Sequence, residues 1–235
     1  MFSNIAKIWN FILDLLYPVI CQGCGKEGSY LCSECQGKIK VPQEFCLSCK
    51  RQSFLGRIHP ECKKAALELE GIFVTADYQT KSIQNLIWHL KYHSVAEIAE
   101  ILSLLMADYF VSRNLLDYFA TAVVIPVPLF KRRLRVRGFN QAELLAQRFA
   151  RRLNLEYLPI LERIRNTKSQ VELSEPERLQ NVKNAFTVRP TPALGERKII
   201  LVDDVATTGA TLNECAKVLK TYEAKEVWGL VVARN

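Results

Sequence analysis

Two neighbouring carboxylates and a short run of hydroxyl side chains stand together near the end of the chain. Asp203 and Asp204 follow the apolar run 199–202, and a segment rich in Thr, 206–211, begins two residues after them. Backbone N–H groups at the start of a helix, with hydroxyls beside them, bind the dianion of a phosphate. Adjacent carboxylates repel a phosphate, but they suit the vicinal hydroxyls of a ribose or a hydrated Mg²⁺ ion. The pattern therefore predicts a site for a ribose 5-phosphate.

The segment after the acids is interpreted as a phosphate-binding loop that opens a helix. Gly209 lets the backbone approach a phosphate closely. The alternative without a ligand is an Asp-rich turn before a capped helix. It accounts for one Asp and one Thr, but not for two adjacent acids followed by several Thr and a Gly. Since both carboxylates are expected to face the ligand, replacing Asp203 and Asp204 should leave the fold intact. The candidate phosphate ligands are Ala206, Thr207, Thr208, Gly209, Ala210 and Thr211.

Cysteines dominate the first 62 residues. Seven of the eight cysteines lie there in Cys-x-x-Cys or His-x-x-Cys pairs. This spacing lets both side chains of a pair point at one metal ion, and two pairs complete a tetrahedral zinc site. The predicted ligands are Cys21, Cys24, Cys32, Cys35, Cys46, Cys49, His59 and Cys62. Cys215 lies in a helical pattern and is interpreted as an ordinary core residue.

Two closed sites of this kind predict structural rather than catalytic zinc. Four protein ligands leave no position for water or substrate. A segment of roughly 45 residues builds little core, so the metal supplies folding energy. Pairing of consecutive knuckles is preferred because each loop is short, and cross-brace pairing is the alternative. A disulfide framework is disfavoured, since nothing marks the chain as secreted.

The positive charge is concentrated in one segment. The chain has a net charge of +8, and residues 131–168 account for all of it with eleven Lys or Arg and three Glu. Such a field attracts phosphates or nucleic acid. Arg148, Arg151 and Arg152 fit a solvated helix face. Residues 131–137 are interpreted as a basic loop whose crowded charges require an anion.

Elements that could position these groups follow residue 66. Strands are predicted over 71–78, 122–128, 155–161, 198–205 and 226–232, and helices over 82–92, 95–113, 141–153 and 211–222. The alternation predicts an α/β fold, with a mainly parallel sheet covered by helices on both faces. Ligands of such sheets bind beyond the carboxyl ends of strands, where the acid pair and the basic segment lie.

Composition and the first residues set the broader organisation. Hydrophobic residues make up 49% of the 235 residues, and no apolar run approaches the roughly 20 residues of a membrane helix. Residues 1–18 have helical apolar spacing, so a helix packed on the protein is preferred over one that docks on a partner or a membrane surface. No cleavage site follows it, so a cytoplasmic location is expected. The predicted parts are an amphipathic helix, 1–18, a double zinc-ribbon module, 19–66, and an α/β domain, 67–235.

A resemblance to a known family rests on several motifs. The run Ile199-Ile-Leu-Val-Asp-Asp-Val-Ala-Thr-Thr-Gly-Ala-Thr211 resembles the signature by which type I phosphoribosyltransferases bind 5-phosphoribosyl-1-pyrophosphate (PRPP). With Ile125-Pro-Val-Pro128 and Arg137-Gly-Phe-Asn-Gln141, it makes nearly the whole chain similar to the ComF family of late-competence and GntX-like proteins. The resemblance implies a type I phosphoribosyltransferase-like fold with an N-terminal zinc-ribbon module.

The same resemblance implies roles for the acidic and basic residues. Asp203 and Asp204 would hold the ribose hydroxyls, and 206–211 would hold the 5-phosphate. Residues 126–137 would correspond to the pyrophosphate loop, with Arg135 and Arg137 as candidate contacts.

A closing loop is implied as well. The polar stretch 163–184 would cover PRPP and exclude water, with Lys168, Gln170 and Arg178 as its candidates. Mg²⁺ would accompany PRPP and stabilise departing pyrophosphate. Purine-salvage relatives often place an acid where Ala206 or Thr207 stands here, which argues against a 6-oxopurine acceptor.

Three functions stay open at this point. The first is a phosphoribosyltransferase whose acceptor the sequence does not identify. The second, implied by the family, is the handling of single-stranded DNA in natural transformation, with a competence helicase and other DNA-uptake proteins as partners. The third is a regulator that senses PRPP without catalysis. The basic segment favours the second, but few aromatics interleave with it, namely Phe130 and Phe139, which weakens a base-stacking surface.

Overall fold

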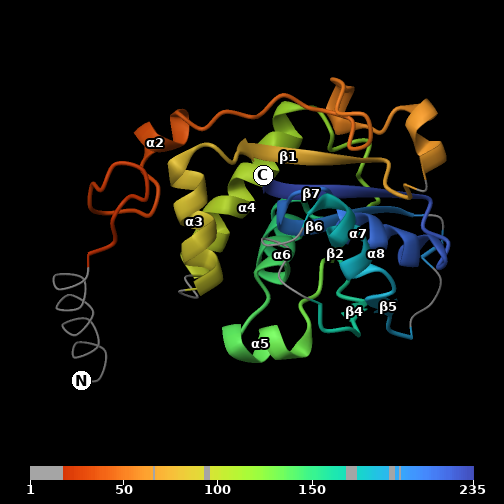
Figure 1. Cartoon of the computed structure of the whole chain (residues 1–235). Helices are drawn as coiled ribbons and strands as arrows, with labels where there is room; N and C mark the ends of the chain where they lie inside the picture. Colours follow the sequence, from red (N-terminus) through yellow and green to blue (C-terminus); the bar gives the residue numbers. More distant parts are fainter. Residues whose placement is uncertain (1–17, 66, 93–95, 168–173, 191–193, 196) are drawn as a thin grey trace.

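The computed structural model describes residues 18–65, 67–92, 96–167, 174–190, 194–195 and 197–235. Its main sheet has five parallel strands in the order β1-β7-β6-β2-β3 (Figure 1). They are β1 (Gly71–Asp77), β2 (Val123–Pro126), β3 (Glu156–Tyr157), β6 (Lys198–Ala206) and β7 (Glu226–Arg234). The predicted mainly parallel sheet is confirmed. The helix predicted over 1–18 lies outside the described residues, apart from Pro18.

Alternate residues of the central strands supply two cores. Ile200 and Val202 of β6 belong to the core on one face, and Ile199 and Leu201 belong to the core on the other. This follows from the two-residue period of a strand, and it explains why β6 reads as a continuous apolar run. The first face packs against α3 (Lys81–Tyr92), α4 (Ala96–Ser112) and α6 (Gln141–Leu153), and the second against α8 (Ala210–Lys220). The four predicted helices are therefore confirmed.

The strand predicted over 155–161 is divided into two. β3 ends at Tyr157, and β4 (Leu161–Arg163) pairs antiparallel with β5 (Phe186–Val188) in a separate small sheet. Pro159 lies at the break, where its fixed φ and missing N–H interrupt a ladder. A short helix, α7 (Glu175–Val182), lies between β4 and β5 in the sequence.

The basic segment is a helix and not the predicted loop. α5 (Lys131–Arg137) contains no Gly or Pro, and Arg, Lys and Leu are good helix formers. Gly138 ends the helix with φ +81°, and its N–H donates to the carbonyl of Leu134 at 2.8 Å. The loop expectation was wrong because it considered only the repulsion between like charges.

The cysteine-bearing segment runs along the edge strand β1 (Figure 1). The N–H of Asp77 donates to the carbonyl of Lys40 at 2.9 Å, and the N–H of Ile58 donates to that of Glu70 at 2.8 Å. The segment includes α2 (Ser33–Gly37) and two 3-10 turns, Phe54–Gly56 and Pro60–Ala65. It therefore protects an edge that could otherwise pair with another chain.

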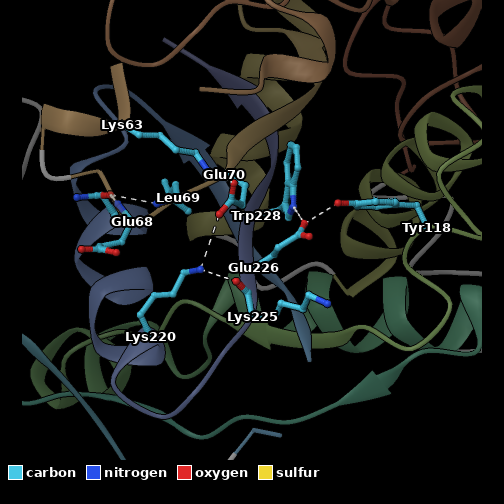
Figure 2. Close-up of polar contacts among 10 residues, drawn as sticks. Lys63, Glu68, Leu69, Glu70, Tyr118, Lys220, Lys225, Glu226 and Trp228 are labelled. Atoms are coloured by element: carbon cyan, nitrogen blue, oxygen red, sulfur yellow. Dashed lines mark hydrogen bonds and ion pairs between the residues drawn. The ribbon is translucent and has the colours of Figure 1, made fainter. Parts of the chain in front are cut away.

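Polar contacts join this segment to the amino ends of the strands (Figure 2). Glu70, just before β1, is ion-paired with Lys63, and its other oxygen lies 3.7 Å from Nζ of Lys220. Glu226, at the start of β7, accepts hydrogen bonds from Tyr118 at 2.7 Å and Trp228 at 2.9 Å. These contacts lie at the end of the sheet opposite Asp203 and Asp204, so they support the fold. No helix in the part of the chain that the structure describes is long and apolar enough to cross a bilayer.

Candidate functional site

A cavity lies at the carboxyl edge of the sheet, and the acid pair forms part of its wall. β6 carries Asp203 and Asp204 to this edge, where the cavity has a volume of about 610 Å³. Its walls come from the end of α3, the residues after β2, α5, the starts of α6 and α8, and β4 with the residues after it. The charged side chains that line it are Lys91, Arg132, Arg133, Arg137, Arg163, Asp203 and Asp204. Five cations around two acids suit a ligand with several negative charges.

Asp204 is held by donors from two helices. It is only 4% exposed, and its Oδ2 lies 2.5 Å from Nζ of Lys91 in the last turn of α3. Its Oδ1 accepts a hydrogen bond from Nε2 of Gln141 at 3.2 Å, and Oε1 of Gln141 accepts one from Arg137 at 2.5 Å. The premise that both acids face only the ligand is therefore wrong for Asp204, whose buried carboxylate pairs with the half-buried ammonium of Lys91, and we expect its replacement to destabilise the fold.

The two carboxyl groups have opposite charge preferences. Burial raises the pKa of Asp203 well above its usual range, and the charge of Asp204 adds to that rise. Burial alone would also raise the pKa of Asp204, but the Lys91 charge and the hydrogen bonds from its neighbours outweigh burial, so that pKa is lowered. Two adjacent acids do not easily share full ionisation, so Asp204 carries the charge and Asp203 holds a proton more readily.

The predicted phosphate loop has the expected strand–loop–helix form. β6 ends at Ala206 and α8 begins at Ala210. Thr208 accepts the N–H of Ala210 at 3.3 Å, and Thr211 lines the cavity. Gly209 has φ +76°, a conformation that favours glycine, and a Cβ there would displace the side-chain end of Leu47, whose Cδ2 it would approach to 2.7 Å. Thr207 is half-buried beside it.

Helical periodicity divides the basic residues of α5. Arg133 and Arg137, one turn apart, line the cavity with Arg132. Arg135 is exposed and is not among the lining residues. Arg148, Arg151 and Arg152 on α6 all pair with Glu100 of α4, so that face is an ion-pair cluster.

The residues proposed for a closing loop are less well placed. Lys168 and Gln170 lie outside the described residues. Arg178 is half-buried on α7 and is not among the residues that line the cavity. The stretch 163–184 includes this helix, whose first turn is fixed by a capping box between Ser174 and Glu177.

Sequence reasoning did not identify Lys91 and Tyr92 as parts of the site, and it placed Arg163 in a closing loop and not in the wall of the cavity. Arg163 is only 8% exposed; it donates to the side chain of Thr167, and its guanidinium lies 5.2 Å from the centre of the Phe186 ring. Its Nε–H has no acceptor among the described residues. A lysine at the end of one helix and an arginine in a three-residue strand carry no local signal. Only the contacts to β6 and to the cavity reveal them.

The cysteines and His59 form two separate clusters. Cys21, Cys24, Cys32 and Cys35 make one, and Cys46, Cys49, His59 and Cys62 make the other, with ligand atoms within 4.8 Å of one another in each. The sulfur atoms of Cys24 and Cys32 are 3.7 Å apart, close to the roughly 3.8 Å expected for two thiolates 2.3 Å from a tetrahedral zinc ion. Donor chemistry and spacing therefore fit two structural zinc ions. The grouping is the consecutive one, and cross-brace pairing is wrong.

The two clusters lie against different faces of the sheet. Cys21 and Cys35 belong to the core under α3, whereas Cys46 and Leu47 belong to the core under α8. Leu47, between two predicted ligands, packs against Gly209, the loop residue just before α8. The second cluster is therefore connected to the predicted phosphate loop through Leu47.

Comparisons with known proteins agree with this arrangement. Competence protein F of Haemophilus influenzae is 32% identical over 223 residues, which cover 91% of this chain and 90% of that protein. The DNA utilization protein YhgH of Escherichia coli is 32% identical over 205 residues, covering 85% and 89%. The chain belongs to the ComF family. Another ComF relative, competence protein ComFC of Streptococcus pneumoniae, is 26% identical over 208 residues, covering 86% of each chain.

The phosphoribosyl transferase domain family matches residues 138–235 of this ComF protein. The match includes β6, the acid pair, the phosphate loop and α8, and it begins directly after α5. The family resemblance and the phosphoribosyltransferase-like α/β fold expected from the sequence are both confirmed. A phosphoribosyltransferase domain implies a PRPP-like ligand.

Proposed function

We propose that this ComF protein binds PRPP or a closely related phosphorylated ribose in the 610 Å³ cavity. Asp203 and Asp204 accept hydrogen bonds from the ribose hydroxyls, and residues 206–211 hold the 5-phosphate. The observation that carries the proposal is that one cavity is lined by the acid pair, by Thr211 of the predicted phosphate loop and by five cationic side chains. Mg²⁺ enters with PRPP through the phosphate oxygens, which are the ligands it prefers. Arg133 and Arg137 face the anionic end of the ligand, and Lys168 and Arg178 belong to a closing segment.

Isothermal titration calorimetry tests this proposal. Ribose 5-phosphate and PRPP should bind measurably, and free ribose should bind at least 100-fold more weakly, because it lacks the dianion that the loop holds. Glucose 6-phosphate keeps a phosphate but changes the sugar, so it should bind more weakly than ribose 5-phosphate. Equal affinity for both sugar phosphates would show that the site recognises the phosphate and not the ribose. Release of pyrophosphate with a labelled acceptor would distinguish a transferase from a protein that only senses PRPP.

A second function, the binding of single-stranded nucleic acid, is favoured by aromatics that the fold brings to the basic helix. Trp88 and Tyr92 on α3 are 51% and 65% exposed, and their ring centres lie 5.7 Å apart. The guanidinium of Arg137 lies 5.7 Å from the centre of the Tyr92 ring. Exposed rings beside a cationic groove are typical of surfaces on which bases stack. The relatives named for competence and DNA utilization agree with such a role.

Substitutions on both elements test this second function. Replacing Arg132, Arg133, Arg135 and Arg137 with Gln should lower the salt dependence of oligonucleotide binding by up to about 3 log units per log unit of salt, at about 0.7 per phosphate contact. Trp88→Leu or Tyr92→Leu should weaken binding by about 1–3 kcal/mol per stacked base. Phe54→Leu is the matched control, because Phe54 is 80% exposed and lies outside the cavity lining. Fluorescence anisotropy across a salt titration measures both effects, and wild-type behaviour of every variant would reject this function.

A further inference from the structure

The acid pair is accompanied by a cation from the chain itself. Lys91 belongs to α3, far from β6 in the sequence, yet its Nζ lies 2.5 Å from Oδ2 of Asp204. Its side chain is 25% exposed and borders the cavity. Burial lowers the pKa of Lys91, but the charge of Asp204, the hydrogen bond to it and the charge of Asp203 together outweigh burial and raise that pKa, so the ammonium stays charged.

One oxygen of each acid already accepts a hydrogen bond within the protein. Oδ1 of Asp204 already accepts from Gln141 at 3.2 Å, and Oδ1 of Asp203 accepts the N–H of Asp204 at 2.8 Å. Mg²⁺ demands near-octahedral oxygen ligands and gives up its waters reluctantly. A divalent ion bridging these acids would also lie beside the ammonium of Lys91 and the guanidinium of Arg137. The acid pair in this arrangement therefore does not fit a Mg²⁺ site.

We propose that Lys91 is the counter-ion of the ribose site and takes the place that a divalent cation would otherwise occupy beside Asp204. The inference rests on the proposed binding of a phosphorylated ribose. An ammonium has three donors, so Lys91 can keep Asp204 and still donate to a ligand hydroxyl or phosphate oxygen. The ribose 5-phosphate part of the ligand then binds without Mg²⁺, and Lys91 fixes both the charge and the position of Asp204.

Calorimetry with ribose 5-phosphate in EDTA and in excess Mg²⁺ tests the proposal, because this ligand lacks the pyrophosphate that brings Mg²⁺ with PRPP. The intact protein should bind with the same affinity, within about twofold, in both buffers. Lys91→Gln keeps a hydrogen-bond donor but no charge, and it should bind at least tenfold more weakly in EDTA, with part of the loss restored by Mg²⁺. Lys91→Arg should keep metal-independent binding. Lys81→Met, at the exposed start of the same helix, is the matched control.

A second measurement does not depend on the sugar phosphate. Mn²⁺ titrated alone and followed by electron paramagnetic resonance should find no site at the acid pair in the intact protein, whereas Lys91→Gln should gain one. The counter-ion role would be overturned if the intact protein bound ribose 5-phosphate at least tenfold more weakly in EDTA than in Mg²⁺. Wild-type binding by Lys91→Gln in EDTA would overturn it as well. Absence of binding in both buffers would instead reject the proposed function on which the inference rests.

Discussion

Asp203→Asn is expected to reduce the affinity for ribose 5-phosphate without lowering the stability of the fold. Asp203 holds a proton readily, so its hydrogen bond to a ribose hydroxyl is a neutral one that contributes about 0.5–1.5 kcal/mol, which corresponds to a loss of roughly 2- to 10-fold. The raised pKa of Asp203 means that its ionisation is less favourable in the folded chain than in the unfolded one. Its contribution to stability therefore falls as pH rises above the ordinary carboxyl value of about 3.9. At neutral pH the Asn variant should melt at the wild-type temperature or above it.

Asp204→Asn should lower both affinity and stability. The lowered pKa of Asp204 contributes stability above its ordinary value, and this contribution is lost as pH falls. Removing the carboxylate leaves the half-buried ammonium of Lys91 without its counter-ion, which costs about 3 kcal/mol. For a chain of this size, that corresponds to roughly 6–12 °C in melting temperature.

Differential scanning calorimetry and ligand titration separate the two variants. Asp108→Asn, on the exposed face of α4, is the control and should change neither property. If Asp203→Asn kept wild-type affinity, the assignment of this acid to the ribose hydroxyls would be wrong. If Asp204→Asn kept wild-type stability, the ion pair with Lys91 would not form in solution.

Loss of zinc should have the largest effect on the folded chain. Structural zinc contributes an apparent 10–16 kcal/mol of binding energy, comparable with or above the whole stability of a typical domain at about 5–15 kcal/mol. Removing both ions should unfold residues 18–62 and uncover the edge of β1, which the segment now protects through contacts such as Asp77 with Lys40. Aggregation through that edge should follow.

Metal analysis by mass spectrometry measures this directly. The purified protein should carry about two zinc ions per chain, and Cys24→Ser or Cys49→Ser should each leave about one. Cys215→Ala is the control, because Cys215 is buried in the core and belongs to neither cluster. Loss of the second ion should also weaken binding of ribose 5-phosphate, since Leu47 packs against Gly209. A zinc-free protein with a native melting curve would refute both metal centres.

The sequence by itself determined features that depend on local spacing. The apolar runs predicted the strands and helices of the sheet, because side chains repeat every two residues in a strand and about every 3.6 in a helix. Cysteine pairs separated by two residues predicted the two ligand clusters, since both side chains of such a knuckle reach one ion. The sequence also identified Asp203, Asp204 and Gly209 as candidate ligand-binding residues, because the acid pair and the loop are contiguous in the chain.

Local reasoning failed where its signal was ambiguous. Like charges over 131–137 suggested a loop, but intrinsic helix propensity and the cap at Gly138 prevailed. Pro159 divided what looked like one strand, and β4 and β5 are too short to show a period.

Only the tertiary structure decided which distant residues complete the site. The pairing of Lys91 with Asp204, the burial of Arg163 in the cavity wall and the approach of Tyr92 to Arg137 all join separate elements. Packing of α3 and α5 around the end of β6 makes these contacts, and no pattern within either segment encodes them. The two zinc clusters likewise lie on opposite faces because their segment crosses the edge of β1. Chemistry that depends on adjacent residues can be read along the chain, whereas charge compensation between segments depends on the geometry of the fold.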